Sequence, residues 1–232
     1  MQNPELPIAP APATWTLADI TALVLAGGRG MRMGGVDKGL QPFNGRALAH
    51  HALQRLAAQQ GGLLHGAIIN ANRNPEQYQA FGQAAFGARR AMVVPDRDSE
   101  YAGPLAGFQA GLDVCCSALM LTVPCDSPLF PLDLATRLLA ALVGAEADMA
   151  MVLAPEAGRD GTIGLRSQPV FCLMRATVAD SLHAFIAAGG RKVDAWTAQL
   201  RLVPVPFDAP TDDPRAFANA NTLDELRQLE NP

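Results

Sequence analysis

The sequence predicts an α/β fold: a Rossmann-like three-layer α/β/α sandwich with a mostly parallel central sheet. Hydrophobic residues make up 49% of the 232 residues, which is enough for a substantial buried core. From Ile20 onward, short apolar runs alternate with longer amphipathic stretches, as they do when helices connect parallel strands. Because no shift in composition divides residues 18–232, we expect them to form a single domain.

The elements follow from this alternation, taken in chain order. The expected strands are the short apolar runs Ile20–Ala26, Ala67–Asn70, Met92–Val94, Leu119–Val123, Met149–Ala154, Val170–Met174 and Leu202–Val205. The expected helices are the amphipathic stretches Ala47–Gln59, Pro75–Phe81, Leu105–Val114, Leu132–Val143, Thr177–Ala188 and Val193–Leu200. A last helix should start after Thr222, because Thr222 and Glu225 have capping-box spacing.

The N-terminal residues 1–17 are predicted to be a flexible tail rich in Pro and Ala, because prolines recur among its alanines. Glu5 stands where a secretory signal would carry basic residues, so this segment is not interpreted as a signal. No apolar run approaches the roughly 18 residues that a membrane-spanning helix needs. We therefore expect a protein without a membrane anchor.

Charge and cysteine content narrow the function classes further. A formal net charge of -4 removes the electrostatic basis for nucleic-acid binding as the main task. The four cysteines form no C-x-x-C pair and have no histidine at zinc-ligand spacing. Free thiols in a reducing compartment are the simplest interpretation, so a cytoplasmic location is expected.

The first expected strand leads directly into Gly27-Gly28-x-Gly30, at the edge of the sheet where open α/β folds bind ligands. Glycines there let backbone N–H groups approach phosphate oxygens. A Walker A loop is excluded because Lys38 is followed by Gly39, and the dinucleotide fingerprint fails at Met33. A surface turn with solvated charges is the alternative. The position directly after the first strand, with Arg29, Arg32 and Lys38 close behind, favours a triphosphate site.

The continuation of this loop carries a family resemblance. Leu25-Ala26-Gly27-Gly28, followed by Arg32-Met33-Gly34-Gly35-Val36-Asp37-Lys38-Gly39, resembles the signature of the molybdenum cofactor guanylyltransferases (MobA family) of the nucleotidyltransferase superfamily. Further segments agree in order: Asn70-Ala71-Asn72-Arg73, Val94-Pro95-Asp96, Gly103-Pro104-Leu105-Ala106-Gly107, Pro124-Cys125-Asp126-Ser127-Pro128 and Asn219-Ala220-Asn221-Thr222. The resemblance covers residues from about 18 to 230 and implies a nucleotidyltransferase domain similar to nucleotide-diphospho-sugar transferases.

The resemblance also implies a reaction: GMP passes from GTP to the terminal phosphate of molybdenum-molybdopterin, and pyrophosphate leaves. GTP and molybdenum-molybdopterin are then the substrates, with molybdenum-insertion proteins and molybdoenzyme chaperones as conceivable protein partners. CMP transfer to the same cofactor, or NMP transfer to a sugar phosphate, is the nearest alternative. A molybdopterin-binding carrier is the alternative without catalysis.

The catalytic group is expected to comprise two phosphate cations, Lys38 and Arg32, and a carboxylate, Asp126. Asp126 follows an apolar run and is the expected ligand of Mg²⁺, with Asn221 as a second candidate. The nucleotide site is expected to comprise the first strand end, the two next strand ends and the catalytic pair, namely Leu25, Ala26, Gly27, Gly28, Lys38, Asn70, Asp96 and Asp126.

The pterin side is less defined by the sequence. Its candidates are polar and basic residues from three segments: Asn219, Asn221, Arg166, Gln168, Arg191 and Lys192. The acceptor phosphate, with a second pKa of about 6, needs no general base. Accordingly, the four histidines are interpreted as packing or surface residues, and His65 and His183 have no obvious partners. Cys125, beside Asp126, is interpreted as a buried apolar residue and not as a molybdenum ligand.

Overall fold

The computed structural model describes residues 15–28, 36–88, 90–97, 103–158, 161–219 and 222–230. Its centre is a seven-stranded sheet with the order β5-β4-β1-β6-β8-β7-β9. The strands are β1 (Ile20–Leu25), β4 (Gly66–Asn70), β5 (Ala91–Val94), β6 (Leu119–Pro124), β7 (Met149–Ala157), β8 (Ile163–Arg175) and β9 (Leu202–Pro206). The neighbours of β1 and β4 pair in parallel, whereas β8 is antiparallel to both β6 and β7. The predicted mostly parallel sheet is confirmed.

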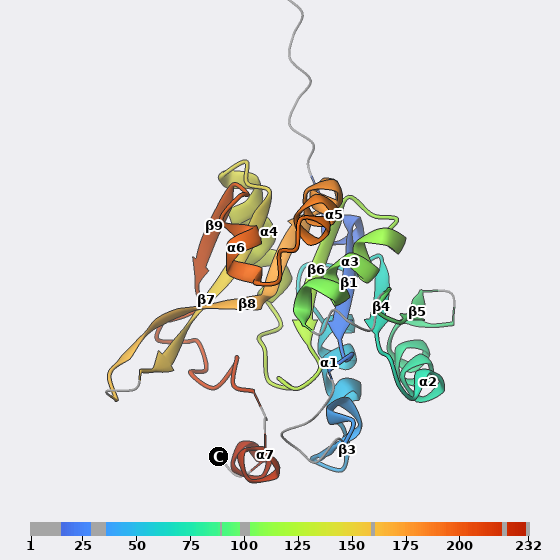
Figure 1. Cartoon of the computed structure of the whole chain (residues 1–232). Coiled ribbons are helices and arrows are strands. Elements are labelled where there is room, and N and C mark those ends of the chain that lie inside the picture. Colours follow the sequence, from blue (N-terminus) through green and yellow to red (C-terminus); the bar gives the residue numbers. More distant parts are fainter. Residues whose placement is uncertain are drawn as a thin grey trace, which may run out of the picture.

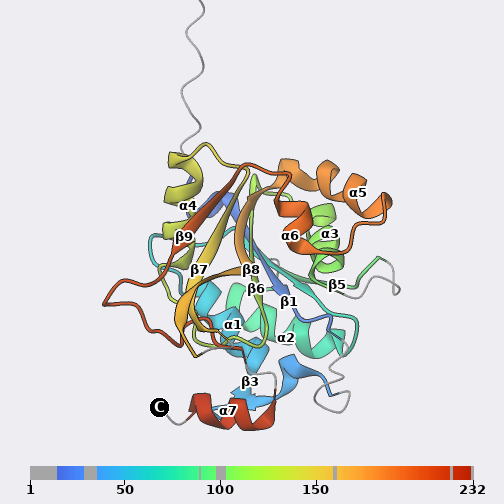
Figure 2. The same cartoon turned by 60° about the vertical axis from the view of Figure 1, so that its left-hand side comes forward.

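Helices cover both faces of this sheet, which gives the three layers seen in Figures 1 and 2. The helices are α1 (Leu48–Ala57), α2 (Pro75–Phe86), α3 (Pro104–Val114), α4 (Leu134–Gly144), α5 (Ala179–Ala187), α6 (Val193–Thr197) and α7 (Leu223–Glu230). One buried cluster joins α1, α2 and α4 to the sheet, and a second joins α3, α5 and α6. Strand β1 contributes side chains to both clusters, because Ala22 and Val24 point to the first and Leu23 points to the second.

Several elements differ from the sequence-based expectation. Strand β7 continues past Ala154 to Ala157, where it pairs with β8, and α6 ends at Thr197 and not at Leu200, because turns follow it. Strand β8 starts at Ile163 and not at Val170, because its first half forms a long hairpin with β7 in which exposed polar residues give no apolar run. Helix α2 continues past Phe81 to Phe86, since Gly82 lets the helix pass close to Ile69 and Ala91. A small hairpin of β2 (Pro42–Phe43) and β3 (Arg46–Ala47) lies where no strand was expected.

The described chain begins before the domain boundary expected at residue 18. Leu17 is 4% exposed and joins the first buried cluster. The guanidinium carbon of Arg175 lies 4.5 Å from the centre of the Trp15 ring, a distance typical of a cation–π contact. Trp15 and Leu17 therefore pack on the fold through their large apolar side chains. Among the described helices, none has the length and apolar character to cross a membrane.

Candidate active site

The carboxyl ends of four parallel strands meet at one edge of the sheet. Strand pairing places Leu25 at the end of β1 level with Asn70 of β4 and with Pro124 of β6. Asn70 is in turn level with Val94 of β5. The residues that follow these ends, which include Gly27, Asp96 and Asp126, are therefore brought to the same edge although they are far apart in the sequence.

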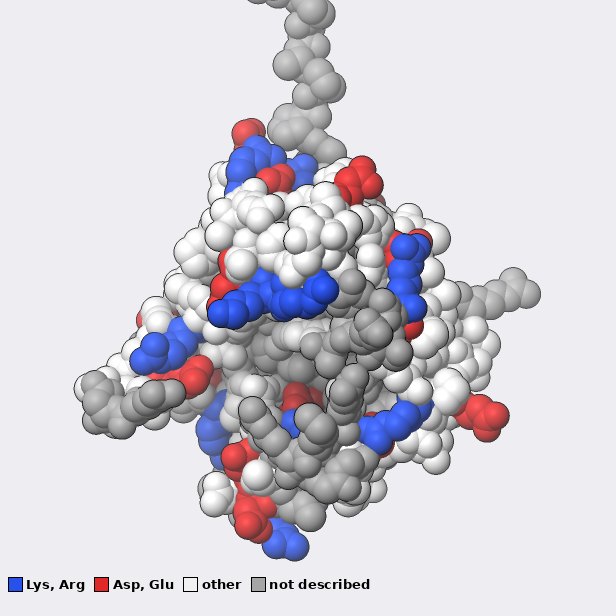
Figure 3. Space-filling view, in the orientation of Figure 1, with Lys and Arg blue, Asp and Glu red and all other residues white. Residues whose placement is uncertain are grey.

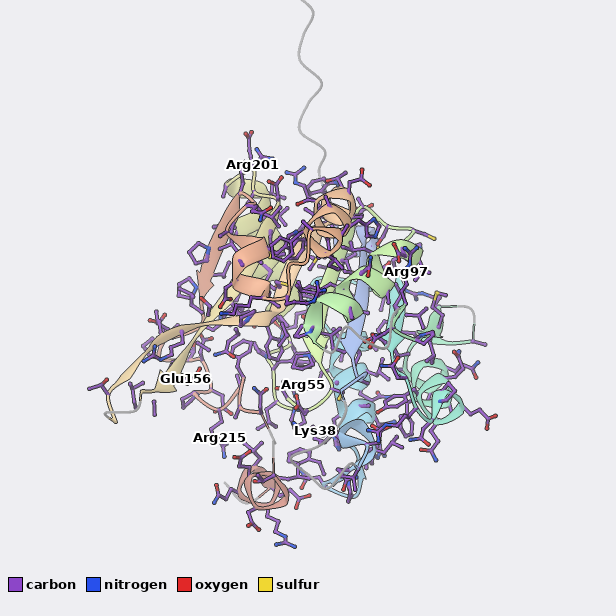
Figure 4. All side chains as sticks on the ribbon, in the orientation of Figure 1. Lys38, Arg55, Arg97, Glu156, Arg201 and Arg215 are labelled. Carbon is purple, nitrogen blue, oxygen red and sulfur yellow. The ribbon has the colours of Figure 1, made fainter. Side chains whose placement is uncertain are left out.

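Lys38 and Asp126 form an ion pair at this edge. The Lys38 Nζ lies 3.1 Å from the Asp126 Oδ2, and the two side chains are 22% and 15% exposed. Lys38 opens a short 3-10 helix, η3 (Lys38–Leu40), whereas Asp126 lies in the turn after β6. Figure 4 shows Lys38 below the arrowheads of β1 and β6. The predicted phosphate cation and the predicted metal ligand are thus adjacent in space.

The loop after Asp126 is fastened to α1. Arg55 Nε donates to the Phe130 carbonyl at 2.5 Å, and Gln59, buried at 5% exposure, donates to the Pro131 carbonyl at 3.1 Å. Gln59 also accepts a 2.8 Å hydrogen bond from the backbone N–H of Ala135. These bonds tie the backbone at Phe130, Pro131 and Ala135, a few residues after the Asp126 turn, to the end of α1. No signal in the sequence points to a role for either side chain.

Two asparagines and one aspartate form a compact group beside the β1 turn. Asn70 Nδ2 donates to Asp96 Oδ1 at 2.8 Å, and Asn72 Nδ2 donates to Asp96 Oδ2 at 2.7 Å. Asn72 Oδ1 accepts from the Asp96 backbone N–H at 2.8 Å. The group also lies close to the turn after β1: a Cβ built on Gly27 would lie only 2.9 Å from Asn70 Oδ1. The predicted nucleotide residues Gly27, Asn70 and Asp96 are therefore brought together.

Some backbone groups of the predicted nucleotide residues at the end of β1 and just after it are already hydrogen-bonded within the protein. The Ala26 N–H donates to the Asn70 carbonyl at 2.8 Å, and the Leu25 carbonyl accepts from the Cys125 N–H at 3.1 Å. The Gly27 carbonyl accepts from Asn72 Nδ2 at 3.1 Å. A carbonyl oxygen keeps a second lone pair for a ligand, but the Ala26 N–H is used.

Asp96 is held from a second direction through the next residue in the chain. Arg97 Nε lies 2.5 Å from Asp113 Oδ2 on α3, and Figure 4 shows Arg97 beside that helix. His183 Nε2 of α5 lies 2.9 Å from Asp113 Oδ1. The expectation that His183 has no partner was wrong, because the packing of α5 on α3 brings together residues 70 positions apart.

Cys125 is 5% exposed, as predicted. Burial, together with the nearby negative charge of Asp126, raises the pKa of the thiol well above its usual range. The protonated thiol is a poor metal ligand. The interpretation as a small buried side chain is confirmed.

The oxygen donors at the edge fit a magnesium ion held by one carboxylate. In the described part of the chain, no three His, Cys, Asp or Glu side chains converge on a common point. Asp126 offers a partly exposed carboxylate next to the predicted phosphate site. Magnesium commonly takes one or two carboxylates and fills its remaining positions with water and substrate phosphate oxygens. One partly exposed carboxylate at this edge is therefore compatible with a bound divalent metal ion.

Asn219 reaches this edge, since the Ser127 hydroxyl, next to Asp126 in the sequence and fully buried, donates to Asn219 Oδ1. The segment that carries Asn219 packs through Phe217, whose ring centre lies 4.9 Å from that of Phe171 and 5.1 Å from that of Phe207. Arg32 and Asn221 lie outside the described residues.

The other pterin-side candidates lie on two separate elements. Arg166 and Gln168 are on β8, where Gln168 Nε2 donates to Glu156 Oε2 at 3.3 Å across the hairpin. Figure 4 shows Glu156 on the arm that this hairpin forms. Arg191 and Lys192 lie between α5 and α6, where Arg191 donates to the Gly190 carbonyl at 2.7 Å. On the face of the molecule seen in Figure 1, basic and acidic side chains are interspersed among uncharged ones (Figure 3).

An open α/β sheet that gathers a glycine turn, a lysine and carboxylates at its carboxyl edge is the architecture of a nucleotide-binding enzyme. The comparison with known families specifies the class. The family described as "MobA-like NTP transferase domain" matches residues 22–203, and the chain belongs to this family.

Named relatives cover almost the whole chain. The chain is 58% identical over 213 residues to a protein of Albidiferax ferrireducens named molybdenum cofactor guanylyltransferase, and the match covers 92% of this chain and 96% of the relative. A protein of the same name from Ralstonia nicotianae is 52% identical, and that match covers 91% of this chain and 96% of the relative.

Solved structures share the fold. Molybdopterin-guanine dinucleotide biosynthesis protein A from Archaeoglobus fulgidus aligns with a TM-score of 0.65 at 22% identity, over 90% of this chain and 96% of its own. The 4-diphosphocytidyl-2C-methyl-D-erythritol synthase from Anaerococcus prevotii aligns with a TM-score of 0.67 at 12% identity, over 91% of this chain and 96% of its own. At these identities the similarity establishes the architecture alone.

Proposed function

We propose that this chain transfers GMP from GTP to the terminal phosphate of molybdenum-molybdopterin, which forms molybdopterin guanine dinucleotide cofactor and releases pyrophosphate. The observation that carries the proposal is the 3.1 Å pair of Lys38 and Asp126 at the carboxyl edge of the sheet, in a chain 58% identical to a molybdenum cofactor guanylyltransferase. A lysine and a carboxylate in contact can bind a triphosphate and its metal ion side by side.

Lys38 has the role of a phosphate cation. Nucleotidyl transfer crowds negative oxygens around the α-phosphorus, so a fixed positive charge lowers the barrier. Lys38 stands at the start of η3, and its partly buried ammonium group sits where the dielectric is lower than in water. Arg32, in the same loop, is assigned to the leaving pyrophosphate, since a guanidinium binds two phosphate oxygens at once.

Asp126 is assigned as the anchor of Mg²⁺, with Asn221 as a further candidate ligand. When bound, the ion neutralises phosphate charge and orients the triphosphate. Asp126 is suited to this task because the loop behind it is fastened to α1 by Arg55 and Gln59. These contacts support the loop that carries Asp126.

The group of Asn70, Asn72 and Asp96 is assigned to the guanosine part of GTP, together with the turn from Leu25 to Gly28. The Asp96 carboxylate is held on both oxygens by amide donors and retains lone pairs for a ribose hydroxyl or a base N–H. This group lies at the ends of β4 and β5, and β1 separates β4 from β6, the strand that leads into Asp126.

The acceptor needs little activation. Its phosphate is largely ionised at neutral pH, so an oxygen of that phosphate attacks the α-phosphorus directly. The new bond joins this oxygen to the α-phosphorus, the bond from the α-phosphorus to the bridging oxygen breaks, and pyrophosphate leaves with that electron pair. Asn219, held by Ser127 beside Asp126, is assigned to the acceptor side with Asn221, Arg166, Gln168, Arg191 and Lys192.

The donor preference tests this proposal. Purified protein with Mg²⁺ and molybdenum-molybdopterin is given GTP or CTP, and the dinucleotide product is quantified by mass spectrometry. We expect kcat/KM for GTP to exceed that for CTP by at least a hundredfold. A preference for CTP would overturn the guanylyl assignment and favour the CMP-transferring alternative.

The carrier alternative is tested with Asp126→Ala. An enzyme should lose turnover by about a hundredfold or more with this variant while it still binds molybdopterin, because the acceptor does not depend on the metal anchor for its contacts. If the chain were a pure carrier, Asp126→Ala would deliver molybdopterin to an apoenzyme as well as the wild type does. Neither the variant nor the wild type would then give dinucleotide product.

A further inference from the structure

The segment after β4 reaches back to both described ends of the glycine-rich loop. We call Asn72, Arg73, Asn74 and Tyr78 the loop clasp. Asn72 to Asn74 connect β4 to α2, and Tyr78 lies in the first turns of α2. These residues lie more than thirty positions from the loop they contact, as the hydrogen bonds at separations of 37, 41 and 45 residues show.

Arg73 links the two ends of the loop to each other. Its Nη2 lies 3.3 Å from the carbonyl oxygen of Gly28 and 3.4 Å from that of Val36. Gly28 comes before the undescribed residues of the loop, and Val36 comes after them. One nitrogen of Arg73 therefore bridges the two described ends of the loop.

Asp37, the residue before Lys38, is held by two further members of the clasp. The Tyr78 hydroxyl donates to Asp37 Oδ1 at 2.5 Å, and Asn74 Nδ2 donates to Asp37 Oδ2 at 3.0 Å. Both carboxylate oxygens are thus directed at α2 and its N-terminal turn. Asp37 consequently serves as an attachment point for the chain that leads into Lys38.

The packing around Tyr78 makes this attachment specific. Tyr78 is fully buried, and burial raises the pKa of its phenol well above the usual value, so the hydroxyl remains a donor. Gly39 packs directly against the Tyr78 ring, where a Cβ would collide with the phenol oxygen. Asp37 and Gly39, which flank Lys38 in the sequence, therefore both contact the buried Tyr78 side chain.

We infer that Tyr78 and Arg73 are positioning residues for nucleotidyl transfer: through Asp37 and the two loop ends they set where the Lys38 ammonium stands relative to Asp126. This inference rests on the proposed function for its kinetic consequence. Neither side chain needs to touch the substrate. The geometric part, that the clasp orders residues 36–41, holds independently of the reaction.

The kinetic test uses Tyr78→Phe, which removes one hydroxyl and leaves the ring in place. We expect kcat for GMP transfer to fall about tenfold while KM for GTP changes less than threefold, since a displaced Lys38 stabilises the transition state less well. Gln79→Met is the matched control: it removes a 2.9 Å hydrogen bond from the same helix to the Ala91 carbonyl, away from the loop. The control should keep wild-type kcat.

A double-mutant cycle separates positioning from general loosening. In a Lys38→Met background, Tyr78→Phe should lower kcat by less than a further twofold, because the group it positions is gone. The same tenfold loss in both backgrounds would overturn the inference. Arg73→Lys keeps the positive charge, but it should also lower kcat, because the two carbonyl contacts of Arg73 are disturbed. Wild-type kcat in Arg73→Lys would show that Arg73 is not a positioning residue.

Hydrogen exchange gives a readout that does not depend on activity. The Leu40 and Gln41 amides donate to the Asp37 and Lys38 carbonyls, so they report order in this segment. Their exchange should accelerate in Tyr78→Phe and remain unchanged in Gln79→Met. Unchanged exchange in Tyr78→Phe would overturn the clasp. If the wild type made no dinucleotide product, the proposed function would fail while the exchange data still decided the clasp.

Discussion

Gly107→Ala should weaken GTP binding indirectly, because the added methyl group would crowd the Asn70 side chain. Gly107 lies in the buried face of α3, one turn after the helix starts. A Cβ at this position would lie 2.5 Å from Leu25 Cδ2 and 2.7 Å from Asn70 Oδ1, closer than real Cβ contacts permit. Either the helix shifts outward or Asn70 moves, and Asn70 is the amide that holds Asp96.

The size of the effect follows from two opposing terms. Overpacking a buried site costs about 1–3 kcal/mol, while replacing Gly by Ala inside a helix returns about 1 kcal/mol. The net loss of unfolding free energy should be about 1 kcal/mol. Losing the 2.8 Å hydrogen bond from Asn70 to the Asp96 carboxylate costs about 1.5–3 kcal/mol of binding at most. GTP affinity should therefore fall by at most about 10- to 150-fold.

Gly111→Ala is the matched control, one turn further along α3. A Cβ there would lie 2.7 Å from Leu23 Cδ2 and 3.1 Å from Met120 Sδ, so the packing cost is similar, but Asn70 is not involved. Urea unfolding should show comparable losses for both variants, and calorimetric titration with GTP and Mg²⁺ should show weaker binding for Gly107→Ala alone. Equal GTP affinity in the two variants would refute the assignment of Asn70 and Asp96 to the nucleotide.

Three further outcomes are expected. Lys38→Met should lower kcat/KM for GTP by about a hundredfold or more in steady-state assays while the melting temperature stays within a few degrees, because it removes a phosphate cation. Cys125→Ala should keep kcat within about threefold of wild type, and mass spectrometry after brief alkylation should find Cys116, which is exposed, labelled well before buried Cys125; rapid labelling of Cys125 would contradict its burial. Arg137→Ala should lower the unfolding free energy by about 2 kcal/mol at pH 7, since Arg137 donates to Asp212 at 2.7 Å and 3.1 Å. The hydrogen bonds from Arg137 hold the pKa of Asp212 below its usual value, so their contribution is present above about pH 4 and is lost as pH falls through the depressed pKa. Urea unfolding between pH 3 and 7 should accordingly show a flatter acid slope for the variant than for wild type.

Much of the fold could be predicted because its elements are apolar runs of the right length. The expected β1, β4, β6 and β9 agree with the structure to within one or two residues at each end, since each is a short apolar run, and β1, β4 and β6 are buried almost throughout. The first half of β8 was missed because its residues are mostly exposed and carry no alternation of apolar and polar side chains. Its pairing with β7 across the hairpin, and not burial, makes it a strand.

One missed element had a readable signal. Asn44 and Gly45 both have positive φ, 47° and 77°, and connect β2 to β3 in a tight antiparallel hairpin. Asn-Gly between short strands is the strongest local hairpin signal, because both residues tolerate this conformation. No apolar run accompanies this signal, because β2 and β3 are each only two residues long.

The site was predictable where a motif marks a strand end, and not where a contact crosses the fold. Asn70 ends an expected strand, whereas Lys38, Asp96 and Asp126 follow expected strands or the glycine-rich loop. The parallel register brings these strand ends to one edge. The contact of Tyr78 with Asp37 joins residues 41 positions apart and has no local pattern. Such contacts depend on how α2 packs on the sheet, which periodicity alone does not specify.

The fate of the GTP phosphates tests the central claim most directly. Purified protein is incubated with molybdenum-molybdopterin, Mg²⁺ and GTP labelled at either the α- or the γ-phosphate, and the products are separated by chromatography. If this chain is a guanylyltransferase, the α-label appears in the dinucleotide cofactor and the γ-label in pyrophosphate, in equal amounts. Release of the γ-label as inorganic phosphate, or its transfer to the pterin, would contradict nucleotidyl transfer.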